Sequence, residues 1–163
     1  MRRSTFRLSP LTVFVGQKYT IARVFDRDDV QTYAALTGDS NEVHLDHDAA
    51  VRAGFKGTLV HGMLVASLFS RIMGMHLPGP GSIYMQQSIN FRAPVYVGDE
   101  ITATVMVTGF DAVKGNIHFE TKVMTSEGNL AIDGKALGRN TLCAFERQTS
   151  QGTTERFEPV SKR

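Results

Sequence analysis

The chain has 163 residues, of which 42% are hydrophobic and 21% are charged, and its formal net charge is +2. This length and composition are those of one globular domain with a sizeable core, and they leave little room for a second domain. The small net charge, without a Lys/Arg block on an aromatic-rich strand, argues against nucleic acid as a partner. The single cysteine, Cys143, excludes an intrachain disulfide and makes a thiolate metal site implausible.

The start of the chain is basic. Residues 1–25 contain several Arg and Lys side chains and no acidic one, and the first acid is Asp26. Basic, hydroxyl-bearing and acid-free beginnings are typical of mitochondrial import sequences, which would place the protein in the mitochondrial matrix. The alternative interpretation is a short basic tail over residues 1–12 of a cytoplasmic protein.

Residues 13–24 have the pattern of two short strands joined by a turn at Gly16. The larger apolar side chains of this segment are expected to anchor it in the core. They are Phe14, Tyr19, Ile21 and Val24.

A helix is predicted to follow, because Asp26, Asp28 and Asp29 supply its N-terminus and Gly38 ends it. Four residues with the i, i+3, i+4, i+7 spacing of one helix face are expected to point inward. They are Val30, Tyr33, Ala34 and Thr37.

Residues 39–44 are predicted to form a turn, because most of them favour local bonds between side chain and backbone over regular structure. A second short helix is predicted to start at Asp46 or Asp48 and to end at Gly54.

Residues 62–75 are apolar on nearly all sides of a helix, so this helix is expected to be covered all round. The apolar run is interrupted by Ser67, Ser70 and Arg71 and is shorter than the roughly 20 residues that cross a bilayer. No membrane span is therefore expected.

The remainder of the domain is predicted to be strands. Residues 83–91 alternate with period two, which predicts one inward face. Strands are also predicted within residues 101–108, 117–123 and 130–137, joined by hairpin turns. One buried helix with five or six strands favours an α+β fold in which an antiparallel sheet wraps the helix. The polar residues 139–163 are predicted to be a C-terminal tail, mobile from residue 144.

Asp39 and His44 flank the predicted turn and can point into one pocket as an acid/base pair around a water molecule. Taken separately, Asp39 would belong to a helix-ending turn and His44 would be a half-buried histidine. Their spacing, together with Gly62 at the start of an apolar helix, favours the catalytic interpretation. His44 and His47 could suggest a metal, but no third ligand joins them at a helical or strand spacing, so no metal is expected.

The run Gly38-Asp39-Ser-Asn41-Glu42-Val-His44, preceded by Tyr33, resembles the motif of the MaoC-like (R)-specific enoyl thioester hydratases and 3-hydroxyacyl thioester dehydratases. Glu42 stands where that family usually has Pro. Further blocks that resemble the family follow at residues 59–70, 78–84 and 91–100. The similarity covers residues 13–138.

The resemblance implies a hot-dog fold and a catalytic dyad of Asp39 and His44. It also implies an oxyanion donor at the Gly62 N–H and a supporting hydrogen-bond role for Asn41 and Ser70. The expected substrate is an acyl-CoA or acyl-carrier-protein thioester, no metal or organic cofactor is needed, and two chains are expected to form a homodimer by joining their sheets edge to edge. Met73 is expected to be a core residue that can also line the acyl tunnel.

The chemistry gives each residue type a reason. A carboxylate and a neutral imidazole that share one water can take a proton from that water and supply a proton to the alpha carbon. Asp39 is expected to be partly desolvated by apolar neighbours. Gly62, without a side chain, lets the thioester carbonyl approach the free N–H groups of a helix start. Two rival functions remain: a hot-dog thioesterase, which usually carries an acid on the central helix, and a non-catalytic acyl-binding or scaffold protein. Residues 62–75 contain no Asp or Glu.

Overall fold

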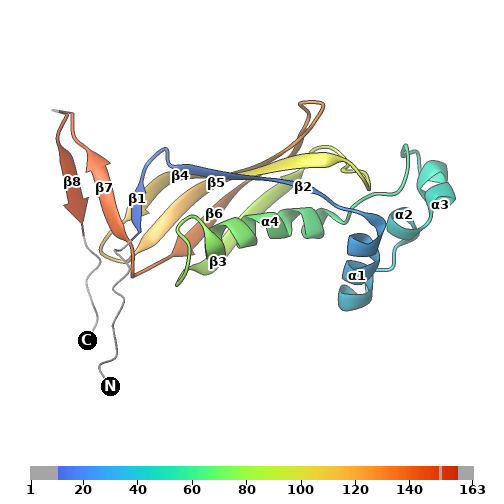
Figure 1. The fold of residues 1–163 in the computed structure, drawn as a ribbon, viewed down its shortest axis with the longest axis horizontal. Helices are drawn as coiled ribbons and strands as arrows, with labels where there is room; N and C mark the ends of the chain where they lie inside the picture. The colour runs from blue at the N-terminus through green and yellow to red at the C-terminus, as the bar shows by residue number, and fades with distance from the viewer. Residues whose placement is uncertain (1–10, 151, 158–163) are drawn as a thin grey trace, which may run out of the picture.

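A computed structural model describes residues 11–150 and 152–157 of the chain (Figure 1). The helices are α1 (Arg27–Thr37), α2 (Glu42–Leu45), α3 (His47–Arg52) and α4 (Gly62–Met75). The strands are β1 (Thr12–Phe14), β2 (Lys18–Val24), β3 (Ile83–Phe91), β4 (Glu100–Asp111), β5 (Asn116–Thr125), β6 (Leu130–Arg139), β7 (Ala144–Gln148) and β8 (Thr154–Phe157). Five strands form one antiparallel sheet in the order β2-β4-β5-β6-β3, and α4 lies along one face of it.

The core lies between α4 and the sheet. Phe69 and Ile72 of α4 are 0% exposed, and Phe119 of β5 is 1% exposed. On β4 and β5 every second residue is buried over 101–107 and 117–123, as the period-two pattern predicts. The predicted α+β architecture, with an antiparallel sheet packed on one apolar helix, is therefore confirmed.

The outer face of α4 differs from the prediction that this helix is covered all round. Met63 and Met75 are 58% and 64% exposed, and Ser67, Ser70 and Arg71 are exposed beside them. The sheet of one chain covers only one side of a helix, because its inner face is a single surface. The prediction is wrong for the single chain.

Strand β3 departs from the predicted alternation. Ile83 is 61% exposed and Phe91 is 54% exposed, although both were expected on an inward face. β3 is an edge strand of the sheet, and among the described strands it pairs only with β6. Its register shifts between Tyr84 and Gln86. A strand at the margin of the sheet lies partly beyond the helix, so its alternation does not translate into burial.

The N-terminal strands and the turn at Gly16 form as predicted, but most of the predicted anchors are wrong. Phe14, Tyr19 and Val24 are 47%, 38% and 42% exposed. The buried residues are the ones that neighbour two of them, Val13 at 1% and Phe25 at 4% exposure. β2 is the other edge strand of the sheet, and a large apolar side chain on an edge strand need not point into the core.

The polar C-terminal segment is not a mobile tail throughout. β7 pairs in parallel with β1, with Thr12 opposite Ala144, and antiparallel with β8, so that β1, β7 and β8 form a second sheet. Phe145 is 0% exposed, and its ring lies 5.0 Å from that of Phe110. A single buried aromatic residue and pairing with the distant β1 order a segment whose polar composition had suggested a tail.

Residues 1–10 of the predicted import sequence lie outside the described residues, which begin at Leu11. Among the described residues, no helix combines the length and the apolar character that crossing a bilayer requires.

Candidate active site

Asp39 follows the C-terminal end of α1. Asp26 and Asp29 form a capping box at the start of this helix, as the acidic residues predict. Gly38 ends the helix with φ of 80°, a left-handed conformation that favours glycine. Beyond this reversal the Asp39 N–H donates to Thr37 Oγ1 at 3.3 Å, which directs the residue back toward α1.

His44 lies on the one-turn helix α2, where the sequence analysis predicted a turn. Asn41 is its N-cap, and its Oδ1 accepts from the Val43 N–H at 3.4 Å. Glu42 is the first helical residue, a position where Pro is also favoured and where an acid suits the positive end of the helix dipole. The departure from the family motif therefore leaves the helix that carries His44 intact.

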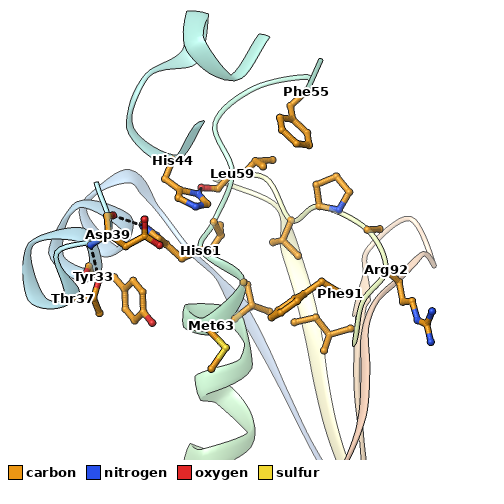
Figure 2. Close-up of a pocket in the computed structure, with 17 residues that line it drawn as sticks. Tyr33, Thr37, Asp39, His44, Phe55, Leu59, His61, Met63, Phe91 and Arg92 are labelled. Atoms are coloured by element: carbon orange, nitrogen blue, oxygen red, sulfur yellow. Dashed lines mark hydrogen bonds between the residues drawn. The ribbon is translucent and has the colours of Figure 1, made fainter. Parts of the chain in front are cut away.

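The ring of His44 is oriented by a hydrogen bond from Nδ1 to the carbonyl of Leu59, at 2.9 Å. A carbonyl can only accept, so Nδ1 carries a proton, and in the neutral ring Nε2 then keeps its lone pair. The side chains of Asp39, His44 and His61 approach one another above the start of α4 (Figure 2), and one ligand-type atom from each lies within 4.8 Å of those of the other two. One water with hydrogen bonds of about 2.8 Å can bridge two groups at that separation.

This group opens into a pocket of about 550 Å³, lined mostly by apolar side chains. Phe55, Met63, Phe91 and Ile132 are among them. Asp39 is exposed, so the partial desolvation expected of it is not provided by this single chain. The pocket has the size and apolar lining to hold an acyl chain next to the carboxylate and the imidazole.

Gly62 is the first residue of α4 and lines the same pocket. The first amides of a helix have no partner inside it, and the N-cap residue His61 makes no side-chain hydrogen bond to them. A Cβ on Gly62 would lie 2.6 Å from Cε1 of Phe91. Glycine is therefore favoured here by the packing of Phe91 as well as by the access that the sequence suggested.

His61 is a residue of the site that the sequence analysis did not single out. It is 2% exposed, its Nε2–H donates to the carbonyl of Asp39 at 3.0 Å, and its ring stacks on that of His44. Its place directly before Gly62, at the start of an apolar helix, was the available signal. Contact with Asp39 could not be inferred, because 22 positions separate the two residues.

The three residues predicted to support the dyad or bind substrate lie in different places. Asn41 lies close to the dyad as the cap of α2, whereas Ser70 is exposed on the outer face of α4 and Met73 is 1% exposed in the core. At 1.5 Å per residue, Ser70 and Met73 are about 12 and 16 Å further along the helix than Gly62. The structure of this chain does not bring these two residues to the pocket.

The structure brings a third side chain with a possible metal-ligand atom, that of His61, next to Asp39 and His44. The two imidazoles are stacked at 3.9 Å with 28° between their planes, so their in-plane lone pairs do not converge on one ion. His44 Nδ1 and His61 Nε2 are already bonded to carbonyls. His47, the partner considered from sequence, lines a different pocket. The arrangement suits a shared water better than a tetrahedral metal.

Cys143 offers no alternative nucleophile. Burial raises the pKa of its thiol to about 11, and its Sγ faces the carbonyl of Pro78 at 3.9 Å. A thiol with this pKa is protonated at neutral pH and does not attack an acyl group.

An antiparallel sheet packed on one apolar helix defines a hot-dog protein, and in this one an Asp–His pair lies beside the uncapped start of that helix. The family model described as MaoC like domain matches residues 11–129. The chain belongs to this MaoC-like family. β6, β7 and β8 lie beyond the matched residues.

Two relatives illustrate the range of the family. The chain is 44% identical over 130 residues to the (R)-specific enoyl-CoA hydratase of Aeromonas caviae, covering 80% of this chain and 97% of the relative. It is also 44% identical over 124 residues to the mitochondrial 3-hydroxyacyl-[acyl-carrier-protein] dehydratase FERN of Solanum lycopersicum, covering 75% and 74%.

Solved structures agree with the predicted hot-dog fold. The (R)-hydratase from A. caviae superposes with a TM-score of 0.75 at 44% identity, over 77% of this chain and 96% of that one. An R-hydratase from Pseudomonas aeruginosa in the unliganded form superposes with a TM-score of 0.73 at 31% identity, over 91% and 89%.

Proposed function

We propose that this protein adds water to trans-2-enoyl thioesters to give (R)-3-hydroxyacyl thioesters, and that it catalyses the reverse dehydration. The observation that carries the proposal is that a carboxylate oxygen of Asp39 and a ring nitrogen of His44 lie within 4.8 Å of each other, beside the uncapped start of α4. The names of the similar proteins, hydratases and dehydratases of such thioesters, support the same reaction.

In the hydration direction, one water is held between the Asp39 carboxylate and Nε2 of His44. The pair removes a proton from this water as its oxygen bonds to C3 of the enoyl group, and it delivers a proton to C2. The C2=C3 electron pair moves toward the thioester, which becomes an enolate until C2 is protonated. The two residues exchange protons with the same water and act as one coupled unit.

The enolate oxygen needs a donor at the end of the pocket where the thioester carbonyl lies. The Gly62 N–H is proposed to be that donor, because it belongs to the first turn of α4, where the helix dipole favours negative charge. A single donor of this kind is worth about 3 kcal/mol of transition-state stabilisation in other enzymes.

The test is to mix the protein with crotonyl-CoA and to follow the enoyl absorbance and free thiol together. Loss of absorbance without thiol release is the expected result. Thiol release would instead indicate a thioesterase, and no change in either signal would indicate a protein that only binds acyl groups. Offering the same acyl group on acyl carrier protein compares the two carriers.

The (R) configuration is tested separately, by coupling the product to dehydrogenases specific for (R)- or (S)-3-hydroxyacyl-CoA. Only the (R)-specific enzyme is expected to reduce its nicotinamide cofactor. Signal with the (S)-specific enzyme would refute the stereochemical part of the proposal and leave the hydration itself in place.

Two copies of the chain are proposed to join through β3. This strand is an edge of the sheet with no neighbour on its outer side among the described residues, and Ile83, Met85 and Phe91 are 61%, 45% and 54% exposed along it. Sedimentation equilibrium is expected to give the mass of two chains for the wild type and of one chain for Ile83→Lys/Met85→Lys. Val113→Lys is the matched control, because Val113 is 73% exposed in the turn between β4 and β5.

A mitochondrial location is proposed from the acid-free basic residues 1–25 and from the similarity to mitochondrial plant dehydratases. The bacterial relatives support the cytoplasmic alternative. Determining the N-terminus of the mature protein decides between them, because removal of the basic segment is expected only after import.

A further inference from the structure

His61 is one of three buried polar side chains in the described part of the chain, and it lies at the point where three elements meet. It precedes α4 directly, and its ring lies beside Asp39 at the end of α1 and His44 on α2 (Figure 2). The proposed reaction needs nothing from this ring as an acid or base, since Asp39 and His44 supply both roles.

The hydrogen bond of His61 determines its tautomer. Nε2 faces the carbonyl of Asp39 at 3.0 Å, and because a carbonyl only accepts, Nε2 carries the proton. In the neutral ring Nδ1 then holds a lone pair, and this atom is buried and has no hydrogen-bond partner among the described residues. An unpaired buried acceptor opposes folding, and an apolar side chain of similar size would avoid that penalty. The value of His61 therefore lies in what its Nε2–H and ring do to their neighbours.

The ring makes two aromatic contacts. It stacks on His44 with 3.9 Å between ring centroids and 28° between planes, and it meets Tyr33 at 4.9 Å and 53°. The stack lies against one face of His44, whereas the bond to Leu59 restrains only one edge of that ring. The two contacts on His44 act in different directions and together limit the rotation of its imidazole.

Asp39 has weaker restraints apart from His61. Its N–H donates to Thr37 Oγ1 at 3.3 Å, and its Oδ1 accepts from the Asn41 N–H at 3.4 Å, both at exposed positions. The bond from His61 is shorter, and its donor is buried. The backbone of Asp39, at the exposed end of a helix, therefore depends on its bond from His61 more than on its bond to Thr37.

We propose that His61 is a positioning residue, whose Nε2–H holds the backbone of Asp39 while its ring stacks on His44, so that the two groups keep the separation that one water can bridge. This inference rests on the proposed function and adds a third residue to its site. It assigns no proton transfer to His61.

Three substitutions separate the two contacts. His61→Gln keeps an N–H near the position of Nε2, His61→Phe keeps a flat ring without a donor, and His61→Leu removes both. Because a misplacement of about 1 Å can cost about 10²-fold in rate, His61→Leu is expected to lower kcat by about 10²-fold with an unchanged KM for crotonyl-CoA. His61→Gln is expected to recover most of that loss, and His61→Phe less of it.

The matched control is His76→Leu. His76 caps the other end of α4 and also stacks on an aromatic ring, that of Tyr19, at 4.2 Å and 6°. This variant is expected to keep the wild-type kcat. Wild-type kcat in His61→Leu, or a His61→Gln variant as slow as His61→Leu, would overturn the proposal, as would a parallel loss of kcat in the His76 control.

A measurement independent of activity keeps the test decisive if His61→Leu does not fold. Long-range ¹H–¹⁵N spectra of the wild-type protein are expected to show His61 with its proton on Nε2 and His44 with its proton on Nδ1. A proton on Nδ1 of His61 would overturn the positioning role even in an active enzyme. The expected tautomers in a protein without hydratase activity would refute the proposed function and leave the contact itself intact.

Discussion

The segment from α1 to the start of α4 and the strands β4 to β6 are stabilised in different ways. In the strands, Ile101, Val105 and Ile117 are 0% exposed and pack under α4. In the segment that carries the site, α2 has no buried residue, and α1 and α3 bury two small or medium side chains each. The sheet is held by apolar burial and the site by caps and single hydrogen bonds.

This difference suggests that one region stabilises the fold and the other orients the groups of the site. Apolar burial stabilises the fold without regard to direction, whereas caps and hydrogen bonds stabilise less but fix the orientation of particular groups. Substitutions in the site segment should therefore reduce activity more than stability, and substitutions under α4 should do the opposite.

The largest expected effect lies in the site. Asp39→Asn and His44→Ala are each expected to lower kcat by about 10²- to 10⁴-fold, because each removes a proton carrier from the shared water. Neither should change the thermal midpoint appreciably, since neither side chain is part of the core. Absorbance assays and melting curves measure the two quantities. Asp48→Asn and His47→Ala are controls from the adjacent α3, and full activity in either dyad variant would contradict the assignment.

The opposite behaviour is expected in the sheet. Phe119→Ala should lower the free energy of unfolding by about 3–5 kcal/mol, because it removes a large ring from a site that is 1% exposed. Denaturant unfolding gives this value, and the folded fraction should keep the wild-type KM. His118→Ala, at an exposed position on the same strand, should change stability little. Equal losses in both variants would show that β5 is not organised as described.

A smaller effect is expected where the two regions meet. Gly62→Ala should lower the free energy of unfolding by about 1 kcal/mol, the low end for overpacking, because the partly exposed Phe91 can shift away from the new methyl group. The double variant Gly62→Ala/Phe91→Ala should lose less than the sum of the single variants. Additive losses in a double-mutant cycle would mean that Phe91 is not the residue that requires glycine.

The smallest effect is a pH dependence in the caps of the site segment. Asp46 caps α3, and the Ala49 N–H that donates to its Oδ1 at 2.8 Å holds the pKa of this carboxyl below its ordinary value. A lowered folded pKa contributes stability above the unfolded pKa of about 3.9, and this contribution is lost as the pH falls through the folded pKa. Asp46→Asn keeps a capping oxygen but does not titrate.

Melting curves should be recorded from about pH 5 to about pH 2, a range that brackets the titration of a carboxyl group. As the pH falls, the thermal midpoint should decrease slightly more steeply in the wild type than in Asp46→Asn. Identical slopes would mean that this cap contributes no pH-dependent stability.

The sequence by itself was sufficient for the features that depend on neighbours along the chain. The capping residues Asp26 and Gly38 place α1, and period-two alternation identifies the inward residues of β4 and β5. The Asp39–His44 pair follows from the motif and the turn-forming residues between its members. Caps, turns and alternation act over a few residues, so they can be read without knowing the fold.

The tertiary structure alone decided what depends on residues far apart. Pairing of β7 with β1 orders a segment predicted to be a tail, and the margin position of β3 exposes side chains predicted to be inward. The contacts of His61 with Asp39 and of Phe91 with Gly62 likewise join residues that no local pattern connects. Burial and contact depend on which surfaces the folded chain brings together, and one sequence does not contain that information in any short stretch.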